Sequence, residues 1–147
     1  MQTIVKPFDQ LSLEELYQLL ELRSEVFIVE QDCAYQDVDG KDQAALHLMG
    51  YEGKILVAYA RIFPPGAYFD KASVGRVVVK GTHRGKALGL QLMQVVLDTV
   101  KKEYNTSEIS LSAHTYLKKF YTDLGFKATG EEYLEDGIPH ILMEKSA

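Results

Sequence analysis

An apolar run, RVVV at residues 76–79, is followed by the glycine-containing turn HRGKALG at 83–89 and then by a second apolar stretch. A turn that leads from a strand into a helix exposes the unpaired N–H groups and the positive dipole end of the helix N-terminus. Glycines such as Gly85 and Gly89 let an anion approach the backbone closely. The pattern therefore predicts an anion site, with a tight connection that holds no ligand as the alternative.

Two well-known nucleotide motifs do not fit this turn. A P-loop, GxxxxGK[ST], would place its first glycine at position 80, which is Lys80, and a Ser or Thr at position 87, which is Ala87. The segment 85–89 also lacks the GxGxxG spacing of dinucleotide-binding folds. Neither a P-loop nor a dinucleotide fold is therefore predicted.

The surrounding hydrophobic pattern predicts the elements that position this turn. Ser12 and Glu15 form a capping-box signal ahead of an amphipathic helix, and Gly125 has the place of a helix C′ residue. The order is β-α-β-β-β-α-β-α-β-β, an α/β arrangement around a mixed sheet. The predicted strands are 3–8, 46–51, 54–63, 73–80, 108–113, 126–129 and 138–143, and the predicted helices are 13–28, 85–103 and about 117–124.

Composition narrows the class of protein. The chain has 147 residues, 46% of them hydrophobic and 25% charged, which predicts one globular domain over residues 1–147. The net charge of −5 and the lack of a Lys/Arg stripe disfavour a nucleic-acid partner; a cationic small molecule or a basic peptide suits the charge better. No apolar run has the length of a membrane span, and the N-terminal segment lacks a signal-peptide core. With a single cysteine, Cys33, we expect a cytoplasmic protein.

The residues of this turn and several other segments resemble one family. RGKALG at 84–89 resembles the (Q/R)-x-x-G-x-(G/A) acetyl-CoA motif of the GNAT N-acetyltransferases, and Phe120-Tyr121 with Gly125-Phe126 resembles the family's FYxxxGF element. The resemblance covers nearly the whole chain. Five segments are similar to the ElaA-like branch in particular: SEVFIVEQ (24–31), YQDVDGKD (35–42), SVGRVVV (73–79), LSAH (111–114) and EDGIPHILM (135–143).

The resemblance implies an α/β fold with a mixed, mostly antiparallel sheet that is flanked by helices and contains a splayed pair of parallel strands. It implies an acetyl-CoA-dependent N-acetyltransferase that uses no metal. The pantetheine arm would pair with the backbone of Val77 and Val79. The pyrophosphate would lie on the amides of the turn, with Arg84 nearby: Gly85, Lys86, Ala87, Leu88 and Gly89.

Two parts of the sequence depart from the family pattern. Ala87 replaces the more usual glycine, which we expect a residue in the first turn of a helix to tolerate. His114 and Leu117 stand where many members have Asn and Ala. Side-chain contacts to coenzyme A from that stretch are therefore not carried over.

The resemblance makes Tyr121 the candidate general acid, because a phenol near the sulfur can donate a proton or a hydrogen bond to the departing thiolate. Its place on an amphipathic helix face also fits a core aromatic residue. The general base is open: His47, Glu135, His140 and a water chain are candidates. A histidine followed by apolar strand residues, as His47 is, more often has a structural role.

Several further interpretations remain open at this point. The acidic segment 30–42 is interpreted as a solvated loop, with the lining of a pocket for a cationic acceptor as the rarer alternative. We expect the lone Cys33 to be inert. The acceptor is a small-molecule or peptide amine, and the apolar strand 56–62 leaves a homodimer open. The alternative function is a non-catalytic acyl-CoA-binding sensor or interaction module of the same fold.

Overall fold

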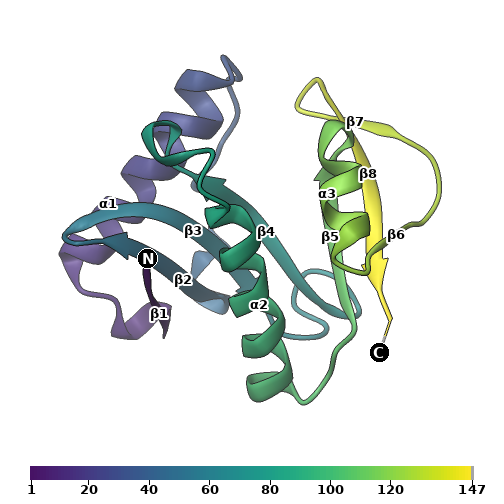
Figure 1. Ribbon diagram of the computed structural model, residues 1–147, viewed down its shortest axis with the longest axis horizontal. Helices are drawn as coiled ribbons and strands as arrows, with labels where there is room; N and C mark the ends of the chain where they lie inside the picture. Colours follow the sequence, from purple (N-terminus) through teal and green to yellow (C-terminus); the bar gives the residue numbers. More distant parts are fainter. Residues whose placement is uncertain (147) are drawn as a thin grey trace.

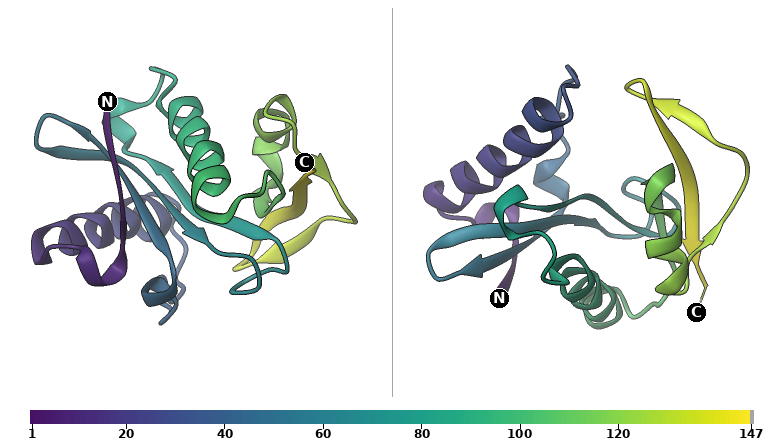
Figure 2. Two further views of the ribbon diagram at one scale, coloured as in Figure 1. Left: turned by 90° about the horizontal axis from the view of Figure 1, so that it is seen from below. Right: turned by 45° about the horizontal axis from the view of Figure 1, so that its top comes forward.

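The computed structural model describes residues 1–146, which form one mixed sheet with helices on both of its faces (Figures 1 and 2). The eight-stranded sheet has the order β1-β2-β3-β4-β5-β8-β6, and β7 pairs with β8. Only the β4–β5 pair is parallel among the strand pairs described. The strands are β1 (Gln2–Pro7), β2 (Leu46–Glu52), β3 (Ile55–Phe63), β4 (Ala72–Val79), β5 (Ile109–His114), β6 (Lys127–Ala128), β7 (Tyr133–Glu135) and β8 (Ile138–Lys145).

The sheet has a separate hydrophobic cluster on each face. Helix α1 (Leu13–Arg23) covers β2–β4 from one side, where Leu19 and Leu22 of the helix belong to one cluster with Tyr59 of β3. Helices α2 (Leu88–Tyr104) and α3 (Lys118–Asp123) cover the other side, where Leu92 and Phe126 are fully buried. The right-hand view of Figure 2 shows α1 and α2 on opposite sides of the strands. The predicted α/β fold with a mixed sheet is confirmed.

Helix α1 begins as predicted and ends differently. Ser12 accepts a hydrogen bond from the Glu15 amide, and the Glu15 carboxylate accepts one from the Ser12 amide, so the predicted capping box is present. The helix continues beyond Arg23 as a π-helix, η2 (Ser24–Glu30), rather than as the α-helix predicted to residue 28. Such segments are frequent at functional sites. Leu13, the first residue of the helix, is 87% exposed.

The C-terminal part of the sheet contains a strand that the sequence pattern did not predict. The short strand β7 pairs with β8 around the turn Asp136-Gly137, and both turn residues have positive φ angles. Every residue of β7 is exposed, so the strand lacks the alternating burial by which strands are recognised. This hairpin brings Glu135 beside the start of β8.

Candidate functional site

The parallel strands β4 and β5 pair over only two positions and then separate. Ala72 lies opposite Ile109 and Ser73 lies opposite Ser110. Figure 1 shows β1–β4 on one side of the opening and β5, β8 and α3 on the other. A cavity of about 770 Å³ is lined by the diverging parts of both strands. The predicted splayed pair of parallel strands is therefore confirmed.

The cavity is lined by side chains from both faces of the sheet. Leu111 and Tyr121 belong to the hydrophobic cluster on the α2 side. Successive residues of a strand point to opposite faces, so Ser112 and His114 of β5 lie on the α1 side, together with His140, the register partner of His114. The opening between the strands thus connects the two faces.

The turn between β4 and α2 forms one wall of this cavity. Its lining residues are Arg84, Gly85, Ala87, Leu88 and Gly89, whereas Lys86 is exposed outside it. Helix α2 begins at Leu88 and not at 85, so the expectation that Ala87 belongs to the first helical turn is wrong. Ala87 is the residue before the helix and has a left-handed backbone, φ 59°, which disfavours residues with a Cβ.

The backbone of β4 presents polar groups to the cavity. The Lys80 N–H donates to the Val57 carbonyl of β3 across 2.7 Å. Backbone groups alternate in direction along a strand, so those of Val79 and Val77 point away from β3 toward the opening. The Val79 carbonyl accepts a hydrogen bond from Arg84 Nε at 3.2 Å. The Arg84 guanidinium also contacts Glu30, with Nη2 and Oε2 2.7 Å apart.

Tyr121 on α3 lies between two other aromatic rings and borders the cavity. Its ring makes edge contacts with Phe120 and Phe126, at centroid distances of 5.1 and 5.9 Å. Burial, with a smaller effect from Tyr116, raises the pKa of Tyr121 above the ordinary value for a phenol. The hydroxyl therefore stays protonated at neutral pH and is a donor.

Three titratable side chains meet at one end of the cavity: His114 of β5, Glu135 of β7 and His140 of β8. The His140 Nδ1 lies 2.7 Å from the Ile138 carbonyl, so it carries the proton and donates it. Its Nε2 lies 3.3 Å from Glu135 Oε2. The ring of His114 lies 4.5 Å from that of His140, and burial together with His140 lowers the pKa of His114. Glu135 and His140, both predicted candidates, are thus brought together.

His114 was not among the candidate general bases, although its departure from the usual asparagine was a signal at that position. Cys33, which also lines the cavity, donates from Sγ to the Asp136 carbonyl at 3.3 Å. This contact joins the segment after η2 to the turn of the β7–β8 hairpin. The two segments that border the α1 side of the cavity are therefore in contact.

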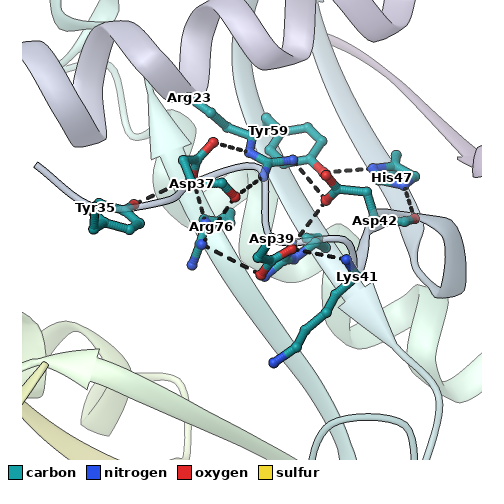
Figure 3. A network of polar contacts seen from close by, with 10 residues as sticks. Arg23, Tyr35, Asp37, Asp39, Lys41, Asp42, His47, Tyr59 and Arg76 are labelled. Atoms are coloured by element: carbon teal, nitrogen blue, oxygen red, sulfur yellow. Dashed lines mark hydrogen bonds and ion pairs between the residues drawn. The ribbon is translucent and has the colours of Figure 1, made fainter. Parts of the chain in front are cut away.

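Most of the acidic segment 30–42 is exposed or half-buried, as expected for a loop, but the side chains of Asp37 and Asp42 are buried in an ion network. Arg23, which is fully buried, donates from Nε to Asp37 and from Nη1 to Asp42, each at 2.9 Å (Figure 3). Burial alone would lower the pKa of Arg23, but nearby Tyr59, Asp37 and Asp42 together raise it, so the side chain is charged. The complete network joins three arginines with three aspartates: Arg23, Arg61, Arg76, Asp37, Asp39 and Asp42.

His47 belongs to this network and not to the cavity lining. Its Nε2 donates to the Asp42 carbonyl at 2.8 Å, and its Nδ1 accepts from the Tyr59 hydroxyl at 2.6 Å. Burial lowers the pKa of His47, which keeps the ring neutral. The burial and the hydrogen bonds of His47 fit the structural role expected for it.

Arg76 marks a β-bulge in β4 next to the cavity. The register between β3 and β4 shifts between Tyr59 and Arg61, and Arg76 has φ 49°. The Nε of Arg76 donates a hydrogen bond to Asp37 Oδ1 at 2.7 Å, and its guanidinium carbon lies 5.3 Å from the centroid of the Tyr35 ring. Bulges redirect strands and are common beside functional sites. The acidic segment thus holds the bulge in place from the α1 side.

Among residues 1–146, no group of three or more His, Cys, Asp or Glu side chains has a metal-site arrangement, and no helix has the length and apolar character of a membrane span.

Comparison with known proteins identifies the architecture that carries this cavity. Residues 9–147 match the model of the acetyltransferase (GNAT) domain. The chain is 42% identical to Protein ElaA of Escherichia coli over 138 residues, covering 92% of this chain and 90% of that protein. It is 41% identical to an acyl-CoA N-acyltransferase from Pseudomonas aeruginosa, with a TM-score of 0.93 and 99% of each chain covered.

The fold is also similar to that of an aminoglycoside 6′-N-acetyltransferase complexed with coenzyme A, at 16% identity and a TM-score of 0.72, covering 97% and 96% of the two chains. The family match and the ElaA relative both extend across the segments that surround the cavity. The chain belongs to the GNAT acetyltransferase family, in its ElaA-like branch.

Proposed function

We propose that this protein transfers an acetyl group from acetyl-CoA to a primary amine by direct attack within a ternary complex. The observation that carries the proposal is the cavity that passes between β4 and β5 and is lined from both faces of the sheet. This layout lets a thioester and an amine reach the same point from opposite sides. Holding the two reactants together removes most of the entropic cost of their encounter.

Coenzyme A would lie along β4 and the turn that follows it. The backbone groups of Val77 and Val79 that point toward the opening would pair with the pantetheine amides in the manner of an added strand, and the Val79 carbonyl would exchange its contact with Arg84 for one of them. The positive φ angles of Gly85 and Ala87 turn the backbone at the start of α2, and the amides from Gly85 to Gly89 would hold the pyrophosphate. Arg84 would exchange part of its contact with Glu30 for a phosphate oxygen.

In the reaction, the amine nitrogen forms a bond to the thioester carbon, and the carbonyl π electrons move to oxygen. Collapse of this tetrahedral intermediate breaks the carbon–sulfur bond and releases the thiolate. Backbone N–H groups beside the β4 bulge would stabilise the oxyanion. Tyr121 would donate a hydrogen bond to the sulfur; because a thiol, with a pKa of about 8.5, is the stronger acid, this bond stabilises the thiolate without full proton transfer.

The Glu135–His140 pair would accept the proton that the amine loses. Since His140 Nδ1 donates to the Ile138 carbonyl, its Nε2 lone pair faces the Glu135 carboxylate. One proton between these two atoms satisfies both acceptors, so the pair is suited to take up a proton. The amide and free coenzyme A are the products.

Turnover separates this function from the alternative of a non-catalytic acyl-CoA-binding module. The protein is incubated with acetyl-CoA and a panel of polyamines, amino acids, aminoglycosides and peptides, and free thiol is measured together with the mass of the product. We expect amine-dependent thiol release. Binding of coenzyme A without turnover of any amine would favour the module.

The assigned phosphate turn has its own test. Gly85→Glu introduces a carboxylate beside the pyrophosphate at a residue with φ 84°, and we expect coenzyme A affinity to fall at least about 100-fold through charge repulsion and backbone strain. Gly66→Glu is the matched control, since Gly66 has φ 86°, an equally open Cβ position and no place in the cavity lining. Equal affinity of the two variants in calorimetric titration would discard the assignment.

A further inference from the structure

On the cavity wall formed by β3 and β4, two buried polar atoms lack a hydrogen-bond partner among the residues that the structure describes: Arg61 Nε and Ser73 Oγ. Arg61 is 2% exposed and Ser73 is 1% exposed, and both residues line the cavity. A buried donor without a partner costs about 1–3 kcal/mol, so such groups are rare without a reason. At a cavity wall, a bound ligand would explain such unpartnered groups, because the ligand would supply the missing hydrogen bonds.

The two side chains lie on the same face of the sheet, around an open space. Arg61 is the register partner of Gly75, and Phe63 is the register partner of Ser73. Directly paired residues, and residues two apart on one strand, share a face. A Cβ at Gly75 would meet no atom within 4 Å. The glycine therefore leaves room between the two unpartnered atoms, on the α1 side where the amine is expected.

The charge of Arg61 is already compensated. Its Nη1 donates to Asp39 and Asp42, at 2.9 and 3.0 Å, and its Nη2 donates to Asp39 at 3.0 Å. In the whole network three arginines balance three aspartates. The remaining Nε–H therefore offers a hydrogen bond without net positive charge, which favours an uncharged oxygen over a carboxylate.

An aromatic surface adjoins the same position. The ring of Tyr68 stacks on Phe63 at 5.3 Å, and Phe69 makes an edge contact with Tyr68 at 5.1 Å. All three residues line the cavity. Because Phe63 is directly opposite Ser73, a ligand oxygen held at Ser73 would place the neighbouring part of the ligand on this apolar surface.

We propose that the acyl acceptor is an α-amino carbonyl compound with an apolar side chain, whose carbonyl oxygen accepts hydrogen bonds from Arg61 Nε and Ser73 Oγ. A carbonyl oxygen has two lone pairs and accepts both. This inference rests on the proposed function for the position of the amine, beside the β4 bulge. Ser73 lies two residues before Gly75, about 7 Å along the strand. One hydrogen bond of about 2.8 Å to the carbonyl oxygen and the short spacer between that oxygen and the amine nitrogen together span a distance of this order.

The test compares phenylalaninamide with phenethylamine, which lacks only the carboxamide, by thiol release with acetyl-CoA. The carboxamide also changes the basicity of the amine, which affects every variant alike. The readout is therefore the ratio of kcat/KM for phenylalaninamide to kcat/KM for phenethylamine, compared between variants. We expect Ser73→Ala to lower this ratio about tenfold, the effect of one buried hydrogen bond. Ser110→Ala is the matched control, a buried serine on the same face outside the cavity lining.

Equal ratios in the two serine variants would overturn the inference. A loss in Ser73→Ala that appears with phenylalanine but not with phenylalaninamide would overturn the assignment of an uncharged oxygen. If no amine is turned over although coenzyme A binds, the proposed function fails, and the subsite is tested by calorimetric titration of the coenzyme A complex with phenylalaninamide. Weaker binding to Ser73→Ala than to Ser110→Ala then supports the subsite, whereas equal binding or none overturns it.

Discussion

The arginine–aspartate network and the group of His114, Glu135 and His140 at the cavity differ in how completely their polar atoms are paired. In the arginine–aspartate network, Arg23 and Asp42 are buried and make hydrogen bonds of 2.9 to 3.0 Å. At the cavity, the Nδ1 of His114 has no partner among residues 1–146, and Glu135 is held by a single contact with His140. The network lies against β2–β4, whereas the cavity group lies on β5, β7 and β8.

This difference separates a structural role from a chemical one. A buried network of paired charges is costly to break, because removing one partner leaves a charge without compensation. A group with free hydrogen-bonding capacity contributes less to folding and can bind a substrate or accept its proton. Arg61 of the network combines both properties, since its Nη atoms are paired while its Nε, at the cavity wall, is not.

The largest expected effect is on stability and lies in the network. Asp42→Ala leaves Arg23 and Arg61, both buried, without a shared acceptor, and we expect the free energy of unfolding to fall by about 3–5 kcal/mol in urea denaturation. Asp98→Ala, at an exposed position of α2, is the control and should change it by less than about 0.5 kcal/mol. Similar values for the two variants would remove the contrast between network and cavity.

The next effect is on catalysis and lies in the cavity. Tyr121→Phe removes the proposed hydrogen-bond donor to the sulfur, and we expect kcat to fall about 100-fold, the lower range for loss of one donor to a developing negative charge. The affinity for coenzyme A should change little, because the ring and its aromatic contacts remain. Steady-state kinetics and calorimetry measure both quantities. An unchanged kcat would show that Tyr121 is only a core residue.

Glu135→Gln should have a smaller effect, about a tenfold loss in kcat, because His140 and His114 remain as proton acceptors. The exposed Glu132 provides the matched variant Glu132→Gln, which should keep full activity. Thermal unfolding should be nearly unchanged in both, since the side chain of Glu135 is half exposed. A large loss of stability in Glu135→Gln would instead place Glu135 with the structural network.

The smallest effect is expected at the start of α2. Ala87 has a left-handed backbone, which costs a residue with a Cβ about 1–2 kcal/mol. Glycine removes this cost but loses more entropy on folding, so we expect Ala87→Gly to raise the free energy of unfolding by about 0.5–1 kcal/mol. Asn105→Gly at the left-handed C-cap of the same helix should gain less, because asparagine tolerates this conformation. An equal gain at both positions would contradict the strain at Ala87.

Elements with strong periodic burial could be predicted from the sequence. The capping box at Ser12, the strands around 46–63 and the C′ residue Gly125 have local causes, and all are present. The resemblance supplied the splayed strand pair, which no local pattern encodes. The left-handed Ala87 was predicted wrongly, because a turn into a helix does not reveal which residue is the last before it.

The sequence allowed single residues of the candidate site to be recognised, but it did not show which of them lie in contact. Glu135 and His140 were each recognised, yet their contact depends on β7, whose exposed residues give no strand signal. The burial of Asp37 and Asp42 depends on arginines that are distant in sequence. At these two residues, charge pairing overrides the expectation that an acidic segment is solvated.

The short contact between β4 and β5 has a consequence for how the reactants would arrive. A crevice open to both sides of the sheet gives each reactant a separate entrance, so neither has to leave before the other can enter. For an enzyme with this layout, initial-rate plots against the two concentrations would give intersecting rather than parallel lines. Substitutions at the entrance on the α1 side would then alter which amine is accepted without changing the affinity for coenzyme A.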